Sequence, residues 1–491
     1  MNSLYKSMTW FWSVALVFLC FYHLELMGQS TSYQKKAKKV AENWISLNEK
    51  MLVEISDELW MNAELPFEEY QTMKIMVDVL EAEGFRIEKG VAEMPTAFVA
   101  SYGSGRPVIA LLAEMDAMPG MSQEAVPYRK VRSGNSAGHG CQHNLVAASS
   151  IGTALALKRV IDELNISGTV KVFGPPAEEV FFGKVYLAKA GLFDTSDVCL
   201  TWHSDRRTNA RYNGTRAVNT VQVKFHKKGR LSPLQSLLNF NHNIEFLREI
   251  LPEGHLISDP AIIKGGGRPG LDPELVEAWY SLRAWDRSSV DDIFEKFKNV
   301  VVFESLLTGS EVEMDLVNGV YPRLPIEALV GIVNRNLQYY GPPEFTNEER
   351  EFANKLQEEY KKEHPSFAAP AALHETIEVP IKTPKPAAND NGDVSWIVPM
   401  SSISGSSRGM DLPSHNWQST AAAGMGIGHK VMILMTKTLT GAAVDLMTNP
   451  AELKAVRDEF EEKTKGFVYK PYIPEQPPLE FYRERNKTFG P

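Results

Sequence analysis

Cysteine is scarce in this sequence, which limits how the fold can be stabilised. The 491 residues include three cysteines, Cys20, Cys141 and Cys199. Cys20 lies in an apolar N-terminal segment, and the other two are too few to support a fold built on disulfide bonds. Cys199 lies in an apolar run that is typical of a strand. A role as a metal ligand therefore stays open for Cys141.

The sequence also lacks a sustained block of basic residues and any internal repeat. Its formal net charge is -9, with 52 lysines and arginines against 61 aspartates and glutamates, which argues against a nucleic-acid partner. With 43% hydrophobic and 23% charged residues, the composition is that of an ordinary globular protein. The length is sufficient for one large or two medium domains.

The N-terminal segment differs from the rest of the chain. Lys6 precedes an uncharged apolar run at 10–22, which is shorter than a membrane span, and the small residue Gly28 follows it. This pattern predicts a signal peptide over residues 1–29 and export, either to the periplasm or out of the cell. The alternative is an uncleaved segment that anchors the protein in a membrane through residues 10–22.

One short segment concentrates metal-binding side chains. Residues 137–144 read AGHGCQHN, in which Cys141 and His143 are two residues apart and follow glycines. In a turn or an extended backbone, a thiolate and an imidazole at this spacing converge on one ion or on two neighbouring ions. A helical pattern over residues 145–164 follows, so the pair is expected just before a helix N-terminus. Taken alone, the pair is more typical of a buried cysteine and a hydrogen-bonded histidine than of a metal site.

Three apolar runs predict buried strands that end in side chains able to bind metal or transfer protons. Residues 108–113 lead into Glu114 and Asp116, residues 169–173 lead toward Glu178 and Glu179, and residues 197–202 lead into His203. Helical patterns at 145–164 and about 182–191 alternate with these runs, which indicates an α/β domain. Because ligands gather at the carboxyl ends of strands in such folds, we expect these side chains at one edge of the sheet.

The pattern changes near residue 217. Strands at 217–225, 275–284 and 311–317 and helices at 233–249 and 290–303 predict a small α+β unit inserted into the first domain. We expect the domains to be 30–216 and 320–470 for the catalytic domain and 217–319 for the insert, with a tail at 471–491 that contains no element. Outside the insert, we expect one long helix at 33–60 and a strand-like run at 394–398.

Six motifs stand in an order that resembles the M20 family of metal-dependent amidohydrolases. They are EMDAMP at 114–119, GHGCQHN at 138–144, GPPAEE at 174–179, WH at 202–203, GDVSW at 392–396 and PSHNWQ at 413–418. The resemblance implies a catalytic domain on a mixed β-sheet flanked by helices, two divalent metal ions, and an inserted α+β lid that also forms a homodimer. It also leaves open a related partner chain.

The resemblance implies a role for individual residues. It makes these residues the metal ligands: Cys141, His143, Glu179, His203 and His415. This donor set suits Zn²⁺ or Mn²⁺. Glu178 becomes the general base, and Asp116 the residue that orients a ligand imidazole. The implied reaction is hydrolysis of the amide bond of an N-acyl amino acid or a small peptide-like substrate, for example an aroyl-glutamate.

Two departures from the family pattern leave a second hypothesis open. In relatives, a turn after the first lid strand brings a histidine into the active site, and this turn is missing here, where residues 225–233 read FHKKGRLSP. Relatives also carry an asparagine in a second turn, and this asparagine is absent here, where residues 269–273 read PGLDP. An active enzyme would need another group in place of the lid histidine, and His226 and His139 are the candidates, although the position of His226 at a strand end argues against it. The alternative hypothesis is therefore a metal-binding but catalytically weak relative that acts as a binding or scaffold subunit.

Overall fold

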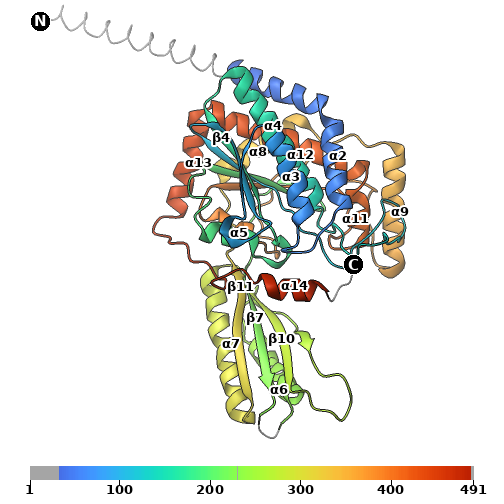
Figure 1. Ribbon diagram of the computed structural model, residues 1–491, viewed down its shortest axis with the longest axis vertical. Coiled ribbons are helices and arrows are strands. Elements are labelled where there is room, and N and C mark those ends of the chain that lie inside the picture. Colours follow the sequence, from blue (N-terminus) through green and yellow to red (C-terminus); the bar gives the residue numbers. More distant parts are fainter. Residues whose placement is uncertain (1–31, 229–230, 488–491) are drawn as a thin grey trace, which may run out of the picture.

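The computed structural model describes residues 32–228 and 231–487. The predicted signal peptide, with its alternative as an anchor, lies outside the described residues, as does the centre of the shortened lid turn. Figure 1 shows a large α/β body and a smaller, elongated unit that projects from it. The boundaries that we drew between domains stay predictions.

The large body is built on a seven-stranded sheet. Its strands, in spatial order, are β1 (Arg86–Lys89), β2 (Phe98–Ser104), β4 (Gly168–Gly174), β3 (Val108–Leu112), β5 (Val198–Ser204), β12 (Met400–Gly405) and β6 (Asn209–Ala210). The central neighbours β4, β3, β5 and β12 run parallel, whereas β1, β2 and β6 pair antiparallel to their neighbours. The sheet is therefore mixed, and the predicted fold class is confirmed.

Helices cover both faces of this sheet, as the uninterrupted apolar strands require. One face packs on the helix at 32–47, α2 (Glu49–Met61), α3 (Tyr70–Ala82), α4 (His143–Leu164), α8 (Glu327–Tyr340), α12 (Gly426–Thr448) and α13 (Pro450–Lys463). The other face packs on α5 (Gly183–Lys189), α10 (Asn391–Ser395) and α14 (Leu479–Lys487). Along β3, Ile109 and Leu111 enter the first core, while Ala110 and Leu112 enter the second. Two more helices, α9 (Asn347–Glu363) and α11 (Trp417–Ala423), pack together at one side.

Helix α12 passes through the middle of the first core. By length and composition it is the one described helix that is apolar enough to cross a membrane, yet 83% of its most apolar stretch is buried inside the protein. Its apolar character therefore fits a core helix.

Three sequence predictions about elements were wrong. The helix expected at 33–60 is interrupted at Asn48, whose side chain donates to the carbonyl oxygen of Trp44 at 2.7 Å and so competes with the helical hydrogen bonds. The run at 394–398 belongs partly to helix α10, since a short buried apolar run does not distinguish a helix from a strand. The strand begins after Pro399, at Met400. The tail contains helix α14.

The projecting unit has its own sheet and core. Its strands are β7 (Ala217–His226), β8 (Leu256–Ile257), β9 (Ala261–Lys264), β10 (Leu275–Ala284) and β11 (Glu311–Val320), and its helices are α6 (Pro233–Glu249) and α7 (Arg287–Thr308). Phe225, Phe240, Tyr280 and Phe297 stack edge to face between the sheet and the helices. Strand β11 leaves one edge of this sheet open.

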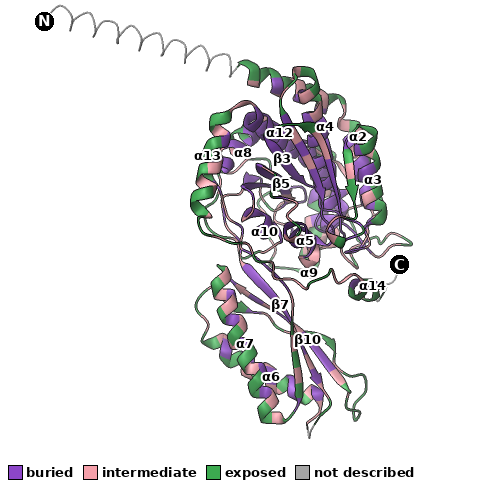
Figure 2. Ribbon diagram, turned by 60° about the vertical axis from the view of Figure 1, so that its left-hand side comes forward, coloured by how far each residue is buried: buried purple, intermediate pink, exposed green. Residues whose placement is uncertain are grey.

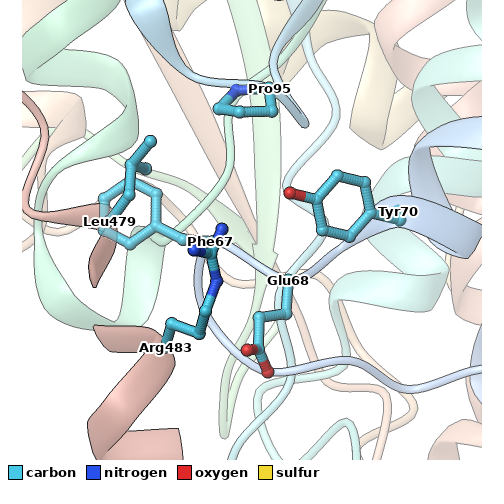
Figure 3. Close-up of a pocket in the computed structure, with 6 residues that line it drawn as sticks. All are labelled: Phe67, Glu68, Tyr70, Pro95, Leu479 and Arg483. Atoms are coloured by element: carbon cyan, nitrogen blue, oxygen red, sulfur yellow. The ribbon is translucent and has the colours of Figure 1, made fainter. Parts of the chain in front are cut away.

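The C-terminal segment connects the two bodies. Tyr482 of α14 is buried against Phe67 and Phe182 of the large body, while the neighbouring Phe481 stacks on Trp279 of β10, with ring centroids 5.5 Å apart. Figure 3 shows a small surface pocket where α14, which contributes Leu479 and Arg483, meets the loop before α3. Figure 2 shows that α14 lies beside the junction of the two bodies.

We expect Tyr482→Ala to release α14. Truncation of a large buried aromatic side chain costs about 3 to 5 kcal/mol, which is more than a helix of this length contributes alone. Amide hydrogen exchange across residues 479–487 should then be much faster than in the wild type. Phe481→Ala is the matched control, because Phe481 is 39% exposed and Tyr482 is 3% exposed. Equal exchange in the two variants would contradict this account of how α14 is held.

Candidate metal centre

The side chains predicted for the site converge at the carboxyl edge of the parallel strands. Glu114 and Asp116 follow β3, and Glu178 and Glu179 begin a single 3-10 turn after β4. His203 lies near the end of β5 itself. Cys141 precedes α4, His143 is the first residue of that helix, and His415 lies in the loop before α11. The expectation that these side chains share one sheet edge is confirmed.

Several backbone positions at the site have left-handed conformations that are uncommon for residues with a side chain. Gln142 has φ 66°, Ala177 has φ 56° and His415 has φ 60°. Each directly precedes, or is itself, a residue of the site. Such conformations persist where the surroundings enforce them, and they cluster at functional sites.

Cys141 is the centre of the cluster. Its Sγ lies 3.2 Å from Nε2 of His203 and 3.3 Å from Nε2 of His415. Oε2 of Glu179 lies 3.6 Å from the same nitrogen of His415, and Oε1 of Glu179 lies 4.0 Å from Nε2 of His143. Two groups of donors share the cysteine, one with His143 and His203 and one with Glu179 and His415, and a third group consists of Glu114, His143 and Glu178.

Two of the histidines present Nε2 to the cluster because Nδ1 is already engaged. Nδ1 of His143 donates to the carbonyl oxygen of Asp116 at 2.8 Å, and Nδ1 of His203 donates to the carbonyl oxygen of Ser204 at 2.8 Å. In the neutral imidazole this leaves a lone pair on Nε2. Burial lowers the pKa of His203 to about 3 and that of His415 to about 4, so both are neutral and able to bind a metal at neutral pH.

The cluster collects more buried negative charge than the described side chains neutralise. Burial, the largest effect, raises the pKa of Glu179 to about 7, with Asp116 adding to the rise and His143 opposing it. Burial likewise raises the pKa of Glu178 and of Cys141. Although burial disfavours its charged form, the surrounding acidic groups raise the pKa of His143 well above its usual range. A cation is the natural counterpart of such a site.

Unpaired buried polar atoms point to the same conclusion. Among the described residues, Nε2 of His143, Oε1 of Glu179 and Oε2 of Glu114 have no hydrogen-bond partner. Buried polar atoms are costly unless they are satisfied. A thiolate, imidazoles and carboxylates at these distances fit a divalent transition metal, so the residues suit metal binding.

Asp116 contacts two of the predicted ligands. Its Oδ2 accepts a hydrogen bond from the backbone N–H of Glu179 at 2.9 Å, and its Oδ1 lies 3.2 Å from Nδ1 of His143. One side chain therefore fixes the ring of His143 and the start of the turn that carries Glu179. This is the geometry of a residue that orients ligands.

The two histidines considered as replacements for a lid histidine lie elsewhere. His139 is buried, with Nε2 3.3 Å from the carbonyl oxygen of Leu59, so it faces the helical core. His226 ends the ten-residue strand β7, beside Glu313 at 3.3 Å. A strand of this length spans roughly 30 Å. His226 therefore lies at the far end of the projecting unit.

The structure adds two residues that sequence reasoning missed, Lys184 and Glu69. Lys184, fully buried in α5, lies 2.9 Å from Oε1 of Glu114 and 4.0 Å from Oε1 of Glu178, and also pairs with Asp390. Burial alone would raise the pKa of Glu114, but Lys184 and His143 lower it to about 2. Of these side chains, Glu114 was the one that the sequence marked as a site candidate, because it directly follows a predicted strand. Lys184 stands in an ordinary amphipathic segment and gave none.

Glu69 was missed as well, and it supports the turn that carries Glu178. Its carboxylate accepts hydrogen bonds from the backbone N–H groups of Phe67 and Ala177, each at 2.9 Å. Burial, followed by repulsion from Asp116, raises its pKa to about 8. Glu69 thus links the loop before α3 to the residue next to Glu178.

Comparison with known proteins identifies relatives over most of the chain, although no protein-family model matches it. One of the p-aminobenzoyl-glutamate hydrolase subunits of Escherichia coli (strain K12) is 28% identical over 464 residues, which are 88% of this chain and 96% of that protein. The Xaa-Arg dipeptidase of Mus musculus is 26% identical over 433 residues, 83% of this chain and 88% of that protein.

Solved structures share the fold. An aminobenzoyl-glutamate utilization protein from Klebsiella pneumoniae superimposes with a TM-score of 0.57 at 14% identity, covering 82% of this chain and 98% of that one. A dinuclear metal-binding peptidase of the M20 family from Bacillus subtilis gives a TM-score of 0.55 at 16% identity, covering 82% and 99%.

We expect Cys141→Ser and His203→Ala to lower the content of bound divalent metal, since each removes a donor that the remaining side chains cannot replace. Metal per chain, measured after dialysis by inductively coupled plasma mass spectrometry, should fall well below the wild-type value. Cys199→Ser is the matched control, because Cys199 is a buried thiol in β5 that belongs to the apolar core. Wild-type metal content in both site variants would refute the assignment.

Proposed function

Because this chain is an M20-type hydrolase, related to metal-dependent amidohydrolases and peptidases, we propose that it cleaves the amide bond of an N-acyl amino acid or a small peptide-like substrate. The observation that carries the proposal is the position of Glu178, a buried carboxylate at the edge of a metal-binding donor cluster. The names of the relatives support amide hydrolysis. They include a p-aminobenzoyl-glutamate hydrolase, a dipeptidase and an N-acetyl-L-cysteine deacetylase from Bacillus subtilis.

The proposed ligands are Cys141, His143, Glu179, His203 and His415. Two donor groups that share Cys141 support a pair of ions, and the mixture of thiolate, imidazole and carboxylate suits Zn²⁺ or Mn²⁺. When bound, such an ion acts as a Lewis acid and lowers the pKa of a coordinated water to roughly 7. Asp116 holds His143 and Glu179 in place for this role.

Glu178 is the proposed general base. Its Oε2 lies 3.5 Å from Nε2 of His143, so it borders the cluster without occupying the centre. Burial raises its pKa above the usual range of a carboxyl, and Lys184 opposes that rise. A carboxylate with a raised pKa is a stronger base, which can accept a proton from the attacking water and return it to the leaving amine nitrogen.

The substitution Glu178→Gln separates metal binding from hydrolysis of the amide bond. We expect Glu178→Gln to retain metal but to lose roughly 100-fold or more in hydrolysis of N-acyl amino acids, because the amide keeps the shape and cannot take up the proton. Metal content and product release should be measured on the same preparations. Glu81→Gln, on the exposed side of α3, should behave like the wild type. Turnover at the wild-type rate would exclude Glu178 as the base.

The alternative function is a metal-binding, catalytically weak subunit. The position of His226 at the far end of β7 favours it, since this histidine does not reach the cluster of its own chain. A missing oxyanion donor typically costs on the order of 100- to 1,000-fold in rate. The same assay discriminates, because this alternative expects full metal content with little turnover on any N-acyl amino acid.

We also propose that the projecting unit forms a homodimer. Its helices α6 and α7 expose large apolar side chains, which are Leu238, Phe246, Val302, Phe303, Leu306 and Leu307. The open edge of β11 lies on the same unit. Exposed apolar surface on this scale is typical of an interface. Because an E. coli relative is named as one of the subunits of a hydrolase, a related partner chain is the alternative occupant.

Leu306→Glu tests this interface. Leu306 is 80% exposed, so the change should not disturb the fold, but a carboxylate buried between two copies is costly. We expect light scattering to show a dimer for the wild type and a monomer for the variant. The control is Leu47→Glu, which changes an equally exposed leucine, 85% exposed, on the large body. A monomeric wild type would refute the homodimer.

A further inference from the structure

A fully buried lysine lies beside the proposed general base. The side chain of Lys184 is 0% exposed, and its Nζ lies 2.9 Å from Oε1 of Glu114 and 4.0 Å from Oε1 of Glu178. The same Nζ pairs with Asp390, which is itself fully buried. Lysine is almost never fully buried unless it is paired. Three carboxylates thus surround one ammonium group.

This ammonium group is charged, and its place in the fold is fixed. Burial alone would lower the pKa of Lys184, but the carboxylates around it raise the pKa above the ordinary range of a lysine. Helix α5 begins against the turn that carries Glu178, because a Cβ at Gly183 would lie 1.8 Å from the carbonyl oxygen of Pro176. The backbone N–H of Lys184 also donates to Oδ2 of Asp390 at 3.0 Å.

Asp390 is held in turn by helix α10, which it directly precedes. Oδ2 of Asp393 accepts a hydrogen bond from the backbone N–H of Tyr321 at 3.2 Å. Oγ of Ser395 accepts one from the backbone N–H of Leu324 at 2.9 Å. These contacts fasten α10 to the segment that follows β11. The ammonium group is therefore held between two anchored helices.

Asp390 would be a sufficient partner for a lysine with a purely structural role. Its carboxylate binds both the backbone N–H and the ammonium group of Lys184. The two further contacts, to Glu114 and Glu178, lie on the side of the metal centre. A structural ion pair between α5 and α10 leaves these two contacts unexplained.

The carboxylate of Glu178 lies between two basic side chains. Its Oε2 lies 3.5 Å from Nε2 of His143, and its Oε1 lies 4.0 Å from Nζ of Lys184. Among the described residues, no other basic side chain lies within 4.0 Å of it. Nε2 of His143 is a proposed metal donor, and a nitrogen that binds a metal has no proton for Glu178. Lys184 is then the remaining basic side chain beside this carboxylate.

Glu178 reaches the space in front of the donors, whereas Lys184 does not. A cavity of about 250 Å³ is lined by Glu178 together with Cys141, His203 and His415. Lys184 is not among the residues that line this cavity. It can therefore act on a substrate or a water molecule only through Glu178.

We propose that Lys184 is a positioning residue for Glu178. Its ammonium group attracts Oε1 toward α5, so that Oε2 points to the donor cluster. The proposal rests on the proposed function, in which Glu178 takes the proton of the attacking water. A misplacement of about 1 Å costs on the order of 100-fold in rate. Without the ammonium group, the carboxylate is free to turn and loses this geometry.

A double-mutant cycle tests this role. We expect Lys184→Met to lower kcat for an N-acyl amino acid by roughly 10- to 100-fold, with KM and metal content unchanged. In the Glu178→Gln background the same change should lower kcat by less than about twofold, because the group that it positions is already inactive. A merely structural role would lower kcat in both backgrounds. Equal losses in the two backgrounds, or loss of metal in Lys184→Met, would overturn the proposal.

The variants are chosen so that a folding defect does not mimic the result. Lys189→Met is the matched control, because Lys189 belongs to the same helix, is 27% exposed at its side chain and pairs with Glu475 at 3.3 Å. Its kcat should equal that of the wild type. If Lys184→Met does not fold, Lys184→Met/Asp390→Asn removes both members of the buried pair, which is less disruptive than removing one. The double variant should lose kcat in the same way, and a wild-type kcat in it would overturn the proposal.

Crystal structures of the wild type and of Lys184→Met separate this proposal from the proposed function, since they need no turnover. We expect the Glu178 carboxylate to take a different rotamer in the variant, while Glu179 and His143 stay in place. If the wild type hydrolyses no N-acyl amino acid, the proposed function fails, and this displacement still supports the positioning role. A Glu178 carboxylate that is unchanged in the variant would overturn that role.

Discussion

The site depends on one electrostatic constraint, which is the burial of several acidic groups around a single imidazole. The groups closest to His143 are Cys141, Glu114, Asp116, Glu178 and Glu179. Such groups repel one another in a low-dielectric interior, and each resists ionisation when buried alone. The fold brings them together because the four acidic residues follow the parallel strands β3 and β4, while Cys141 precedes helix α4 at the same edge of the sheet. Positive charge must therefore be supplied at that edge, partly by Lys184 and otherwise by bound cations.

Charge is distributed unevenly across the site, because acidic side chains lie on one side of it and basic side chains on the other. Acidic donors lie at the ends of β3 and β4, whereas basic side chains lie beyond β5 and β12. His203 stands at the boundary, since its Nε2 faces Cys141 while Arg211 on the other side helps to lower its pKa.

Much of the sheet and the donor cluster was predictable because short-range patterns determine them. Strand β10 and helix α6 match the predicted ranges, and the strands predicted at 108–113, 169–173 and 197–202 each lead into a site residue. What could not be predicted depends on contacts distant in sequence. Lys184 is separated from Asp390 by 206 residues, and nothing near it in the sequence marks it as buried. The basic side chains that line the cavity beside the metal centre are similar, since Arg211, Arg323 and Lys385 come from three segments with no common motif.

The C-terminal segment restricts how far the projecting unit can move. That unit is joined to the large body by β7 and β11, a pair of adjacent strands that would by themselves permit hinge motion. Tyr472 contacts α7 of the unit, where its hydroxyl donates to Asp291 at 3.0 Å and its ring lies 4.2 Å from the guanidinium carbon of Arg287. Ten residues later, Tyr482 is buried in the large body. A rotation of the unit would break one of these contacts or draw α14 from its place. The orientation of the unit is therefore coupled to a helix that packs on Phe67, close to the buried carboxylate of Glu69 and the turn that carries Glu178.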